Sequence, residues 1–429
     1  MLKYIWMVIQ DLFLSVTFVT LIHELLRSRF AGKRLRIHWA GIILGTVSAI
    51  ILSLVKYNTN KIVSSRWNHS IYVYIIGFTL AFTLFSLLSE VKMRERDGIL
   101  ALLTSLSGAG LSAVWIFYAL PSAISYPFIF NTMGNGYLSW YYIQRVMGWL
   151  LAFLILYIYA RLLSHVARQL KHQGLVLFTL LAGLLANAGY TLCRFFVPWV
   201  NRARWLKWSI AFDREKHGWA MAMVKFSTRH AMTFLWIVAA LVALLIAAFY
   251  AENVKITEPY DNPAQLRKLK ARGKKRRRMA RCLGAFLALI LVSLTAVKAY
   301  DTREVTLSAP ETFTVMEDRI LVPIETVSDG HLHRFEYKTE NDIDVRWIVV
   351  KKPDSAAYGV GLDACEVCGN AGYYERNGQV ICKRCDVVMN INTIGFKGGC
   401  NPIPLAYEME EGNLSFQISD LMAGEKEFR

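Results

Sequence analysis

The chain has 429 residues, and 55% of them are hydrophobic. A soluble protein of this length has a lower apolar share, and here the apolar residues lie in runs of about twenty, the length that crosses a bilayer. The net charge of +17 is uneven, since residues 1–299 hold 36 Lys and Arg against 10 Asp and Glu, whereas residues 300–429 hold 13 against 22. The basic excess fits cytoplasmic loops of a membrane protein, and we expect no nucleic-acid partner.

Residues 1–299 are expected to form a polytopic transmembrane domain of about eight helices. The first apolar run is too long for a cleavable signal peptide and has no small-residue cleavage site after it. The ends of the fourth and sixth helices are hard to place, because Pro121, Pro127 and Pro198 fall near them. The expected spans lie near residues 4–25, 38–56, 70–89, 99–121, 143–164, 175–197, 231–251 and 280–299.

The loop charges predict the orientation of these spans. The loops after the first, third and fifth spans are basic, and residues 265–281, before the eighth, form the most basic segment of the chain. With eight spans these four segments share one side, which the positive-inside rule makes cytoplasmic. The loop 198–230 is also basic but falls on the opposite side, and its Trp205 and Trp208 suggest a helix lying in the interface. The N-terminus and the tail are therefore expected outside the cytoplasm.

The pattern changes after residue 300. Short β-branched, partly alternating runs are separated by turn residues, as in "FTVMEDRILVPIETV", "LHRFEYKT", "DVRWIVVKK" and "NLSFQI". Such runs predict strands and turns. Residues 300–429 are thus expected to form a β-rich extracytoplasmic metal-binding domain, large enough to have its own core.

Five of the seven cysteines lie in this tail. Cys365, Cys368, Cys382 and Cys385 form two CxxC pairs separated by thirteen residues, and Cys400 follows in "GFKGGCNPIP". Two CxxC turns present four thiolates to one ion, and Gly369 after Cys368 allows the backbone to turn tightly. The spacing leaves three readings open: structural zinc, iron or an iron–sulfur cluster, and disulfide or thiol redox chemistry.

The tail resembles a known family over residues 305–422. The segments "VRWIVVKKPDSAAYGVGLDACEVCG", "GYYERNGQVICKRCDVVMNINTIGFKGGCNPIPL" and "ISDL" are similar to the Fe-S-containing predicted membrane proteins (domain of unknown function 2318). All five tail cysteines, residues 392–395 and residues 398–402 match the family pattern. Members usually accompany bacterial iron-uptake systems that pair a ferric iron permease with a periplasmic iron-binding protein. The resemblance therefore implies a multi-pass protein of the bacterial inner membrane whose tail holds iron or an iron–sulfur cluster.

Two further groups are candidate ligands beside the paired cysteines. His331 and His333 are expected on one face of a strand, where they either bind metal or are exposed strand histidines, and the resemblance favours His333 as the ligand. Cys400 follows two glycines and precedes Asn-Pro, a setting that lets the backbone approach a bound group closely. The predicted ligand set is therefore the five tail cysteines with His333.

The spans carry few groups that suggest chemistry. Asp11 lies well inside the first span and is a candidate for a proton or ion path, whereas Glu24 is expected to pair with Arg27 one turn on. No expected helix carries two histidines one membrane depth apart, which disfavours haem, and no pair of broken helices marks a transporter.

The main hypothesis is a membrane-anchored metal redox protein that supports extracytoplasmic iron acquisition by electron transfer, as an electron-transfer or metal-reductase component. The alternatives are a structural zinc module of a membrane transport complex and a thiol–disulfide redox protein.

Overall fold

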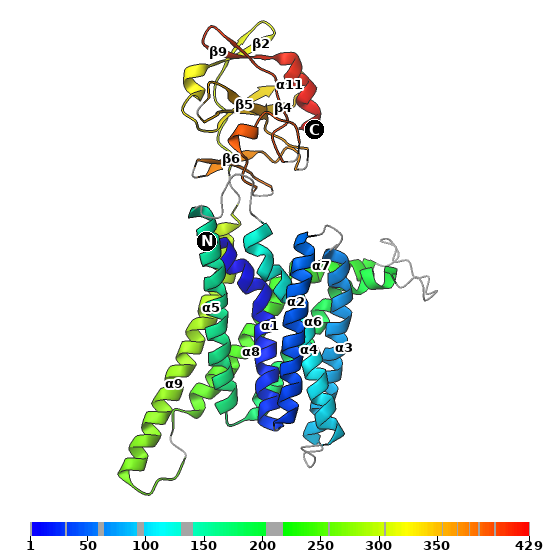
Figure 1. Cartoon of the computed structure of the whole chain (residues 1–429), viewed down its shortest axis with the longest axis vertical. Helices are drawn as coiled ribbons and strands as arrows, with labels where there is room; N and C mark the ends of the chain where they lie inside the picture. Colours follow the sequence, from blue (N-terminus) through cyan, green and yellow to red (C-terminus); the bar gives the residue numbers. More distant parts are fainter. Residues whose placement is uncertain are drawn as a thin grey trace. The chain divides into compact units, whose positions relative to one another are not determined.

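The computed structural model divides the chain into two compact units, shown in Figure 1. Residues 1–129 and 143–301 belong to the first unit, and residues 130–142 and 302–429 belong to the second, here called the membrane unit and the tail unit. The side of the membrane on which the tail lies stays a prediction. The structure describes residues 2–30, 32–58, 64–91, 98–129, 140–202, 218–255, 258–303, 306–353, 355–366, 368–376, 378–384, 387–398 and 400–428.

Eight helices of the described residues are long and apolar enough to cross a membrane, which confirms the expected number. A short helix, α7 (Gly218–Arg229), is too short to span. The eight are α1 (Leu2–Arg29), α2 (Lys33–Asn58), α3 (Ser64–Val91), α4 (Ile99–Ile129), α5 (Trp140–Gln169), α6 (Gln173–Arg202), α8 (Ala231–Glu252) and α9 (Pro263–Val292).

Several helices run further than the apolar runs that predict them. Helix α4 continues through Pro121 and Pro127, and α6 continues through Pro198. Helix α9 begins at Pro263, so most of the basic run 265–281 is its first half, and the Asn262 side chain caps it by accepting a hydrogen bond from the Gln265 amide. Hydropathy detects only the part of a helix that lipid can cover, whereas Lys, Arg and Ala also favour helix. The predicted interface helix at Trp205 and Trp208 lies outside the described residues.

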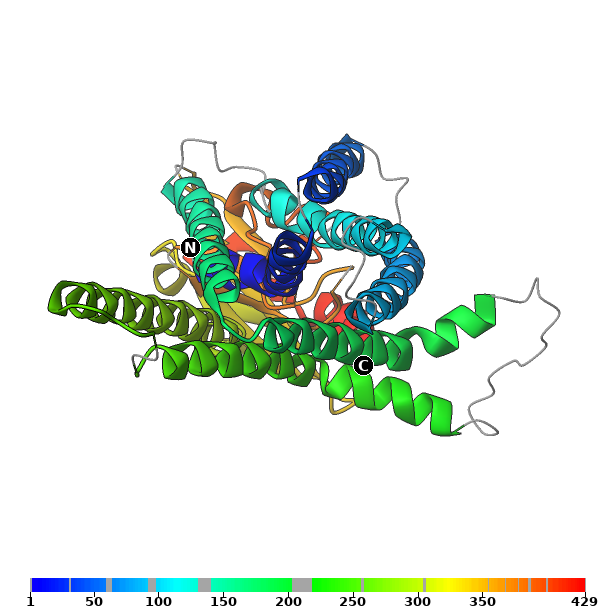
Figure 2. The same cartoon turned by 90° about the horizontal axis from the view of Figure 1, so that it is seen from below.

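Helix α1 forms the centre of the membrane unit, with α4 and α6 packed against it (Figure 2). It buries fifteen of its 28 residues, distributed around the helix, and its apolar side chains belong to the largest hydrophobic cluster of the chain. A helix that is buried on several sides must satisfy any polar side chain it carries within the protein.

The last span ends in an irregular turn. After α9, residues Ser293–Val297 form a π-helical turn, η2, followed by α10 (Lys298–Asp301). Two contacts join this end to the start of α1: Lys298 donates to Gln10 Oε1 at 2.7 Å, and the Trp6 indole donates to Asp301 Oδ2 at 2.9 Å. The two ends of the membrane unit's chain are thereby tied together.

The described residues of the tail unit form three antiparallel sheets, as the strand-like runs predict. One has the order β1-β2-β9-β8, one β3-β4-β5, and β6 pairs with β7. A short helix, α11 (Ile418–Gly424), follows the last strand. The strands are β1 (Thr314–Met316), β2 (Arg319–Pro323), β3 (His333–Lys338), β4 (Asp344–Lys351), β5 (Tyr358–Leu362), β6 (Tyr373–Arg376), β7 (Gln379–Cys382), β8 (Glu408–Glu410) and β9 (Asn413–Gln417).

Strand β4 separates two cores. Its alternate residues Val345, Trp347 and Val349 belong to one cluster, in which Trp347 stacks on Phe335 with ring centroids 5.5 Å apart. Ile348 and Val350 belong to a second cluster, which also contains three of the tail cysteines. Because side chains alternate along a strand, both faces of β4 are covered, and this explains its nearly continuous apolar sequence. The second cluster is the setting of the candidate site.

Candidate metal centre

The first CxxC pair forms a tight knuckle after β5. The amide of Cys365 donates to the Gly369 carbonyl at 3.1 Å, and the Gly369 amide donates to the Cys365 carbonyl at 2.9 Å. Inside this loop the Cys368 amide donates to Sγ of Cys365 at 3.1 Å. Gly369 has φ of +66°, a conformation that side chains with a Cβ rarely adopt, so the glycine is required for the turn as predicted. An amide aimed at a sulfur stabilises the thiolate form of that sulfur.

The second pair begins at the end of the β6–β7 hairpin. Cys382 is the last residue of β7 and pairs with Tyr373 of β6. The amide of Lys383 donates to the Gly372 carbonyl at 2.9 Å, and Arg384 donates to the Cys368 carbonyl at 3.1 Å, which joins the two pairs. Cys385 lies outside the described residues. The hairpin therefore brings Cys382 to the first knuckle although seventeen positions separate it from Cys365.

Three buried thiols meet at this place. The sulfur atoms of Cys365, Cys368 and Cys382 all lie within 4.8 Å of one another. Buried soft donors at this separation suit a metal that prefers thiolate, namely zinc, iron or an iron–sulfur cluster. The arrangement fits such a group: the three side chains converge, one receives an amide hydrogen bond, and their neighbours are apolar.

Cys400 lies beside this group. Its side chain is half-buried and packs against the same cluster as the three thiols. The Tyr373 hydroxyl donates to the Cys400 carbonyl at 2.6 Å and so ties the loop of Cys400 to the hairpin. Burial, with the thiols of Cys365 and Cys382 and the carboxylate of Asp363, raises the pKa of Tyr373 far above its usual range, which keeps its hydroxyl a donor. The role of Cys400 as a ligand stays a prediction.

A buried ion pair lies next to the knuckle formed by Cys365 and Cys368. Arg334 and Asp363 are 1% and 0% exposed, and Arg334 Nε lies 3.0 Å from Asp363 Oδ2. The other guanidinium nitrogens donate to Ser308 and to the carbonyl of Tyr373. Asp363 Oδ1 accepts the Tyr373 amide at 2.8 Å, and Arg346 adds a second cation at 3.4 Å. Every atom of the buried pair that needs a partner thus finds one near the cysteines.

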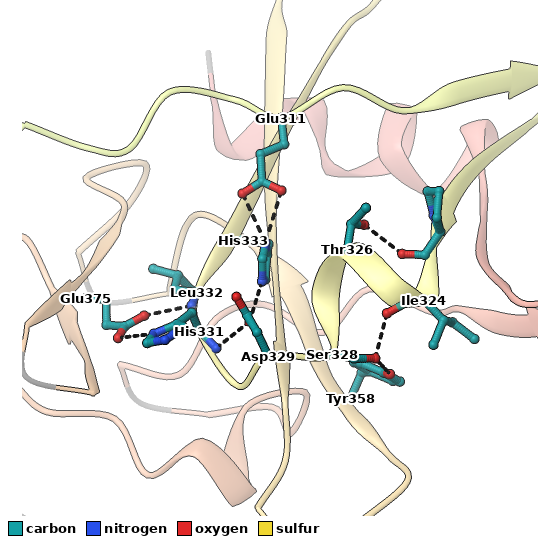
Figure 3. Close-up of polar contacts among 11 residues, drawn as sticks. Glu311, Ile324, Thr326, Ser328, Asp329, His331, Leu332, His333, Tyr358 and Glu375 are labelled. Atoms are coloured by element: carbon teal, nitrogen blue, oxygen red, sulfur yellow. Dashed lines mark hydrogen bonds and ion pairs between the residues drawn. The ribbon is translucent and has the colours of Figure 1, made fainter.

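The two histidines lie in different surroundings, as Figure 3 shows. Strand β3 begins at His333, so the prediction that both residues share a strand face was wrong. His333 is buried, and its ring is held between two carboxylates: Nδ1 lies 3.0 Å from both oxygens of Glu311, and Nε2 lies 2.8 Å from Asp329 Oδ1. His331 is exposed and pairs with Glu375 at 2.8 Å.

The Glu311 and Asp329 carboxylates on either side of the His333 ring, here called the His333 clamp, change the pKa of His333. Burial alone lowers its pKa, but the hydrogen bonds and charges of Asp329 and Glu311 outweigh burial and raise the pKa above its ordinary value. The same contact lowers the pKa of Asp329. Among the described residues, the group of ligand atoms that meet at the sulfurs does not include His333. Its role as a metal ligand stays a prediction.

The sequence predicted the clustered cysteines as candidate ligands, whereas it did not reveal three residues that support them. Arg334, Asp363 and Tyr373 act through contacts between distant segments, and no spacing reveals such contacts. A weak signal existed for two of them: Arg334 stands inside a strand-like run, and Asp363 directly precedes "ACEVCG". A charge in such an apolar setting needs a buried partner of opposite sign.

Comparisons with known proteins agree with the tail's resemblance. Residues 327–428 match the family model described as FtrD-like, membrane iron-sulfur containing protein. No curated protein and no solved structure matches the chain. The match begins beside the histidine clamp and includes all five tail cysteines, so the tail unit is similar to a family of membrane iron–sulfur proteins.

Proposed function

We propose that the chain is a membrane-anchored redox protein whose tail holds a thiolate-bound iron or iron–sulfur centre. The observation that carries the proposal is the convergence of three buried sulfurs within 4.8 Å, in a segment that matches a membrane iron–sulfur family. Cys365, Cys368 and Cys382 would hold the group, with Cys385 of the second CxxC pair as the fourth thiolate and Cys400 beside them. Such a centre exchanges single electrons, which suits interconversion of ferric and ferrous iron.

The protein's own residues have definite tasks in this proposal. The Cys368 amide stabilises a thiolate at Cys365, and the Arg334–Asp363 pair fixes the knuckle against the hairpin. The apolar side chains around the sulfurs limit access of water and thereby influence the reduction potential of a bound centre. The proposed place is the extracytoplasmic side of a bacterial inner membrane, next to an iron permease and an iron-binding protein.

The experiment is a metal analysis of the full-length protein. It is purified in detergent without oxygen, its iron, acid-labile sulfide and zinc are measured, and its visible spectrum is recorded before and after dithionite. We expect iron and a visible band that bleaches on reduction. A colourless protein with one zinc per chain would instead establish the structural zinc module, and a metal-free protein whose cysteines react only after reductant would establish thiol–disulfide chemistry.

A further inference from the structure

A basic pocket lies where the membrane-spanning part of α8 ends. Its volume is about 280 Å³, and it is lined by the turn between α5 and α6, the segment after α8 and the first half of α9. Seven of the described residues that line it are Lys or Arg, and two are Glu. Because the apolar run of α8 ends at Glu252 and the pocket begins there, the pocket lies at the level of lipid headgroups.

The two acids leave most of the positive charge in the pocket. Glu258 pairs with Arg272, whose Nη1 lies 3.4 Å from Glu258 Oε2. Glu252 Oε2 accepts the backbone amide of Lys171 at 3.0 Å. Seven cations against two acids give the described lining a formal excess of five positive charges. Such a pocket favours an anionic group, and a phosphate is the anion that Arg and Lys bind most readily.

Arg276 is fixed in the wall of this pocket by uncharged partners. Its Nε lies 3.1 Å from Gln169 Oε1 at the end of α5, and its Nη1 lies 3.4 Å from Asn253 Oδ1 just after α8. These contacts orient the guanidinium and join three helices without neutralising its charge. A cation that is already held in place loses less conformational freedom when it binds an anion. The pocket is therefore more than a run of mobile lysines.

An apolar groove lies between α8 and α9, on the membrane side of the pocket. Its volume is about 520 Å³, and most of its lining is small, including Ala243 and Ala247 of α8 and Gly284 of α9. A Cβ built on Gly284 would meet nothing within 4 Å, so the groove is open at that point. Small side chains leave room between two neighbouring helices for another apolar group.

The length of this α8–α9 groove matches one leaflet of a bilayer. Tyr250 and Arg281 line its end nearest the basic pocket, and Leu291 lines its deep end. Arg281 and Leu291 are ten positions apart, which is about 15 Å along a helix, half of the roughly 30 Å hydrocarbon core. Tyr and Arg are residues that commonly lie at the boundary between hydrocarbon and headgroups.

The pocket and the groove lie on the same face of α9. The residues of α9 that line one or the other recur at steps of four and three, the spacing that keeps side chains on one side of a helix. A molecule with an anionic head and an apolar chain can therefore contact both while it lies along this face. The recurring residues are Gly273, Arg277, Ala280, Gly284, Leu287 and Leu291.

We propose that the membrane unit binds an anionic phospholipid here, with its phosphate in the basic pocket and an acyl chain in the α8–α9 groove. The excess of cations selects a negatively charged head, and the apolar lining and leaflet length of the groove select a hydrocarbon chain. The bound lipid fastens α9, the span that precedes the tail unit, to α8. This binding site goes beyond the proposed redox function and does not depend on it.

The positive-inside rule alone explains part of these observations. Basic side chains lie on all sides of the first half of α9, and Lys275 and Arg278, for example, do not line the pocket. Such charges keep a segment on one side of the membrane wherever they point. That rule does not require a pocket with a fixed Arg276, or an apolar groove on the same helix face. The two explanations differ in whether the position of a charge matters or only the number of charges.

The test compares two double variants of the full-length chain that lose the same charge. Lys274→Gln with Arg277→Gln removes two cations from the pocket, whereas Lys275→Gln with Arg278→Gln removes two from the same helix turns outside it. Each protein is purified in detergent and titrated with dioleoylphosphatidylglycerol, and native mass spectrometry measures the Kd of the first bound lipid. The pocket variant should bind about tenfold more weakly than the unmodified chain, and the control variant should change by less than about twofold.

Two further arms separate a lipid from a free anion. Dioleoylphosphatidylcholine has the same chains but no net charge, so the unmodified chain should bind it about tenfold more weakly than dioleoylphosphatidylglycerol. Gly284→Leu, which fills the groove, should weaken binding of dioleoylphosphatidylglycerol, whereas Ala285→Leu, at an exposed neighbour that does not line the groove, should not. An excess of inorganic phosphate should leave the lipid bound, because phosphate has no chain to fill the groove.

Equal affinity for the two lipids, or equal losses in the two double variants, would overturn the proposal, since only total charge would then matter. Displacement of the lipid by inorganic phosphate, with no effect of Gly284→Leu, would also overturn it and would identify a site for a free anion. Gel filtration and circular dichroism identify any variant that fails to fold, and Gly284→Leu is an independent test because it retains every charge. None of these outcomes bears on the metal content of the tail.

Discussion

Asp363 receives Nε of Arg334 at 3.0 Å through one carboxylate oxygen and the backbone amide of Tyr373 at 2.8 Å through the other. It stands two residues before Cys365, while Tyr373 begins the hairpin that ends in Cys382. A single carboxylate thus joins the two segments that present the sulfurs. Its removal should affect the knuckle and the hairpin together.

Asp363→Asn should destabilise the tail unit by about 3–5 kcal/mol, because Arg334 would remain buried without a compensating charge. Asp363 also supports the segments that carry the cysteines, so its loss should weaken metal binding by about 10–100-fold. Amide hydrogen exchange over residues 358–376 of the full-length protein measures the first effect, and metal competition measures the second. Asp342→Asn, which breaks an exposed pair with Lys338, is the control and should change little. Equal exchange in the two variants would contradict the prediction.

Cys365→Ser and Cys382→Ser should each lose bound metal, since a hydroxyl is a poor replacement for a thiolate. The matched control is Cys282→Ser, an exposed cysteine of α9. Metal per chain, measured on purified full-length protein, is the readout. If all three variants retain the metal of the unmodified chain, the sulfur cluster is not the metal site.

The stability of the His333 clamp should depend on pH in a definite direction. The pKa of His333 is raised in the folded state, so its contribution is fully present below its unfolded value near 6.5 and is lost as pH rises through the folded value. The pKa of Asp329 is lowered, so its contribution is lost as pH falls below about 3.8.

Hydrogen exchange of residues 329–338 should therefore increase, beyond the intrinsic effect of pH, when pH is raised from 6 to 8.5. His333→Gln should abolish this extra increase, whereas His331→Gln should keep most of it, because His331 is exposed. The same His333→Gln protein tests the predicted ligand role: unchanged metal content would remove His333 from the ligand set.

Gly361 permits a close approach between β5 and the segment that follows Cys400. A Cβ at this position would lie 2.7 Å from Pro402 Cβ and 2.8 Å from the Ile403 carbonyl oxygen. Gly361→Ala should push this segment away at a cost of about 1–3 kcal/mol and make the Cys400 thiol react faster with an alkylating reagent. Mass spectrometry of the labelled peptide gives the rate. Gly284→Ala, where a Cβ meets nothing, should leave that rate unchanged.

The sequence predicted the parts of the fold that depend on local properties. Eight apolar runs predicted eight helices long enough to span, and short β-branched runs predicted strands such as β4 and β9, because lipid and a packed core select residues position by position. The extent of α9 was missed, since its basic half is helical for reasons that hydropathy does not measure. Pro121 suggested an early end to α4, but a membrane environment retains helices through proline.

In the candidate site, too, the sequence predicted local features and missed contacts between distant segments. The CxxC spacing and Gly369 predicted the knuckle at Cys365 and Cys368, because all of its geometry is local. The predicted partner of Glu24 was wrong, because this contact joins segments that are distant in sequence. Arg27 is near in sequence, but the fold brings Ser164 and Arg168 to the Glu24 carboxylate. The clamp around His333 likewise depends on Glu311, which lies on a separate segment.

The π-helical turn at residues 293–297 sets the rotational phase of everything that follows it in the last span. A π turn contains one residue more than an α turn, so Lys298 and Asp301 are rotated by about 100° from where an uninterrupted helix would point them. That rotation directs Lys298 at Gln10 and Asp301 at Trp6. If the same five residues formed an ordinary α-helical turn, both side chains would point away from α1 just before the chain enters the tail unit, so the extra residue of the π turn is what keeps them in contact with it.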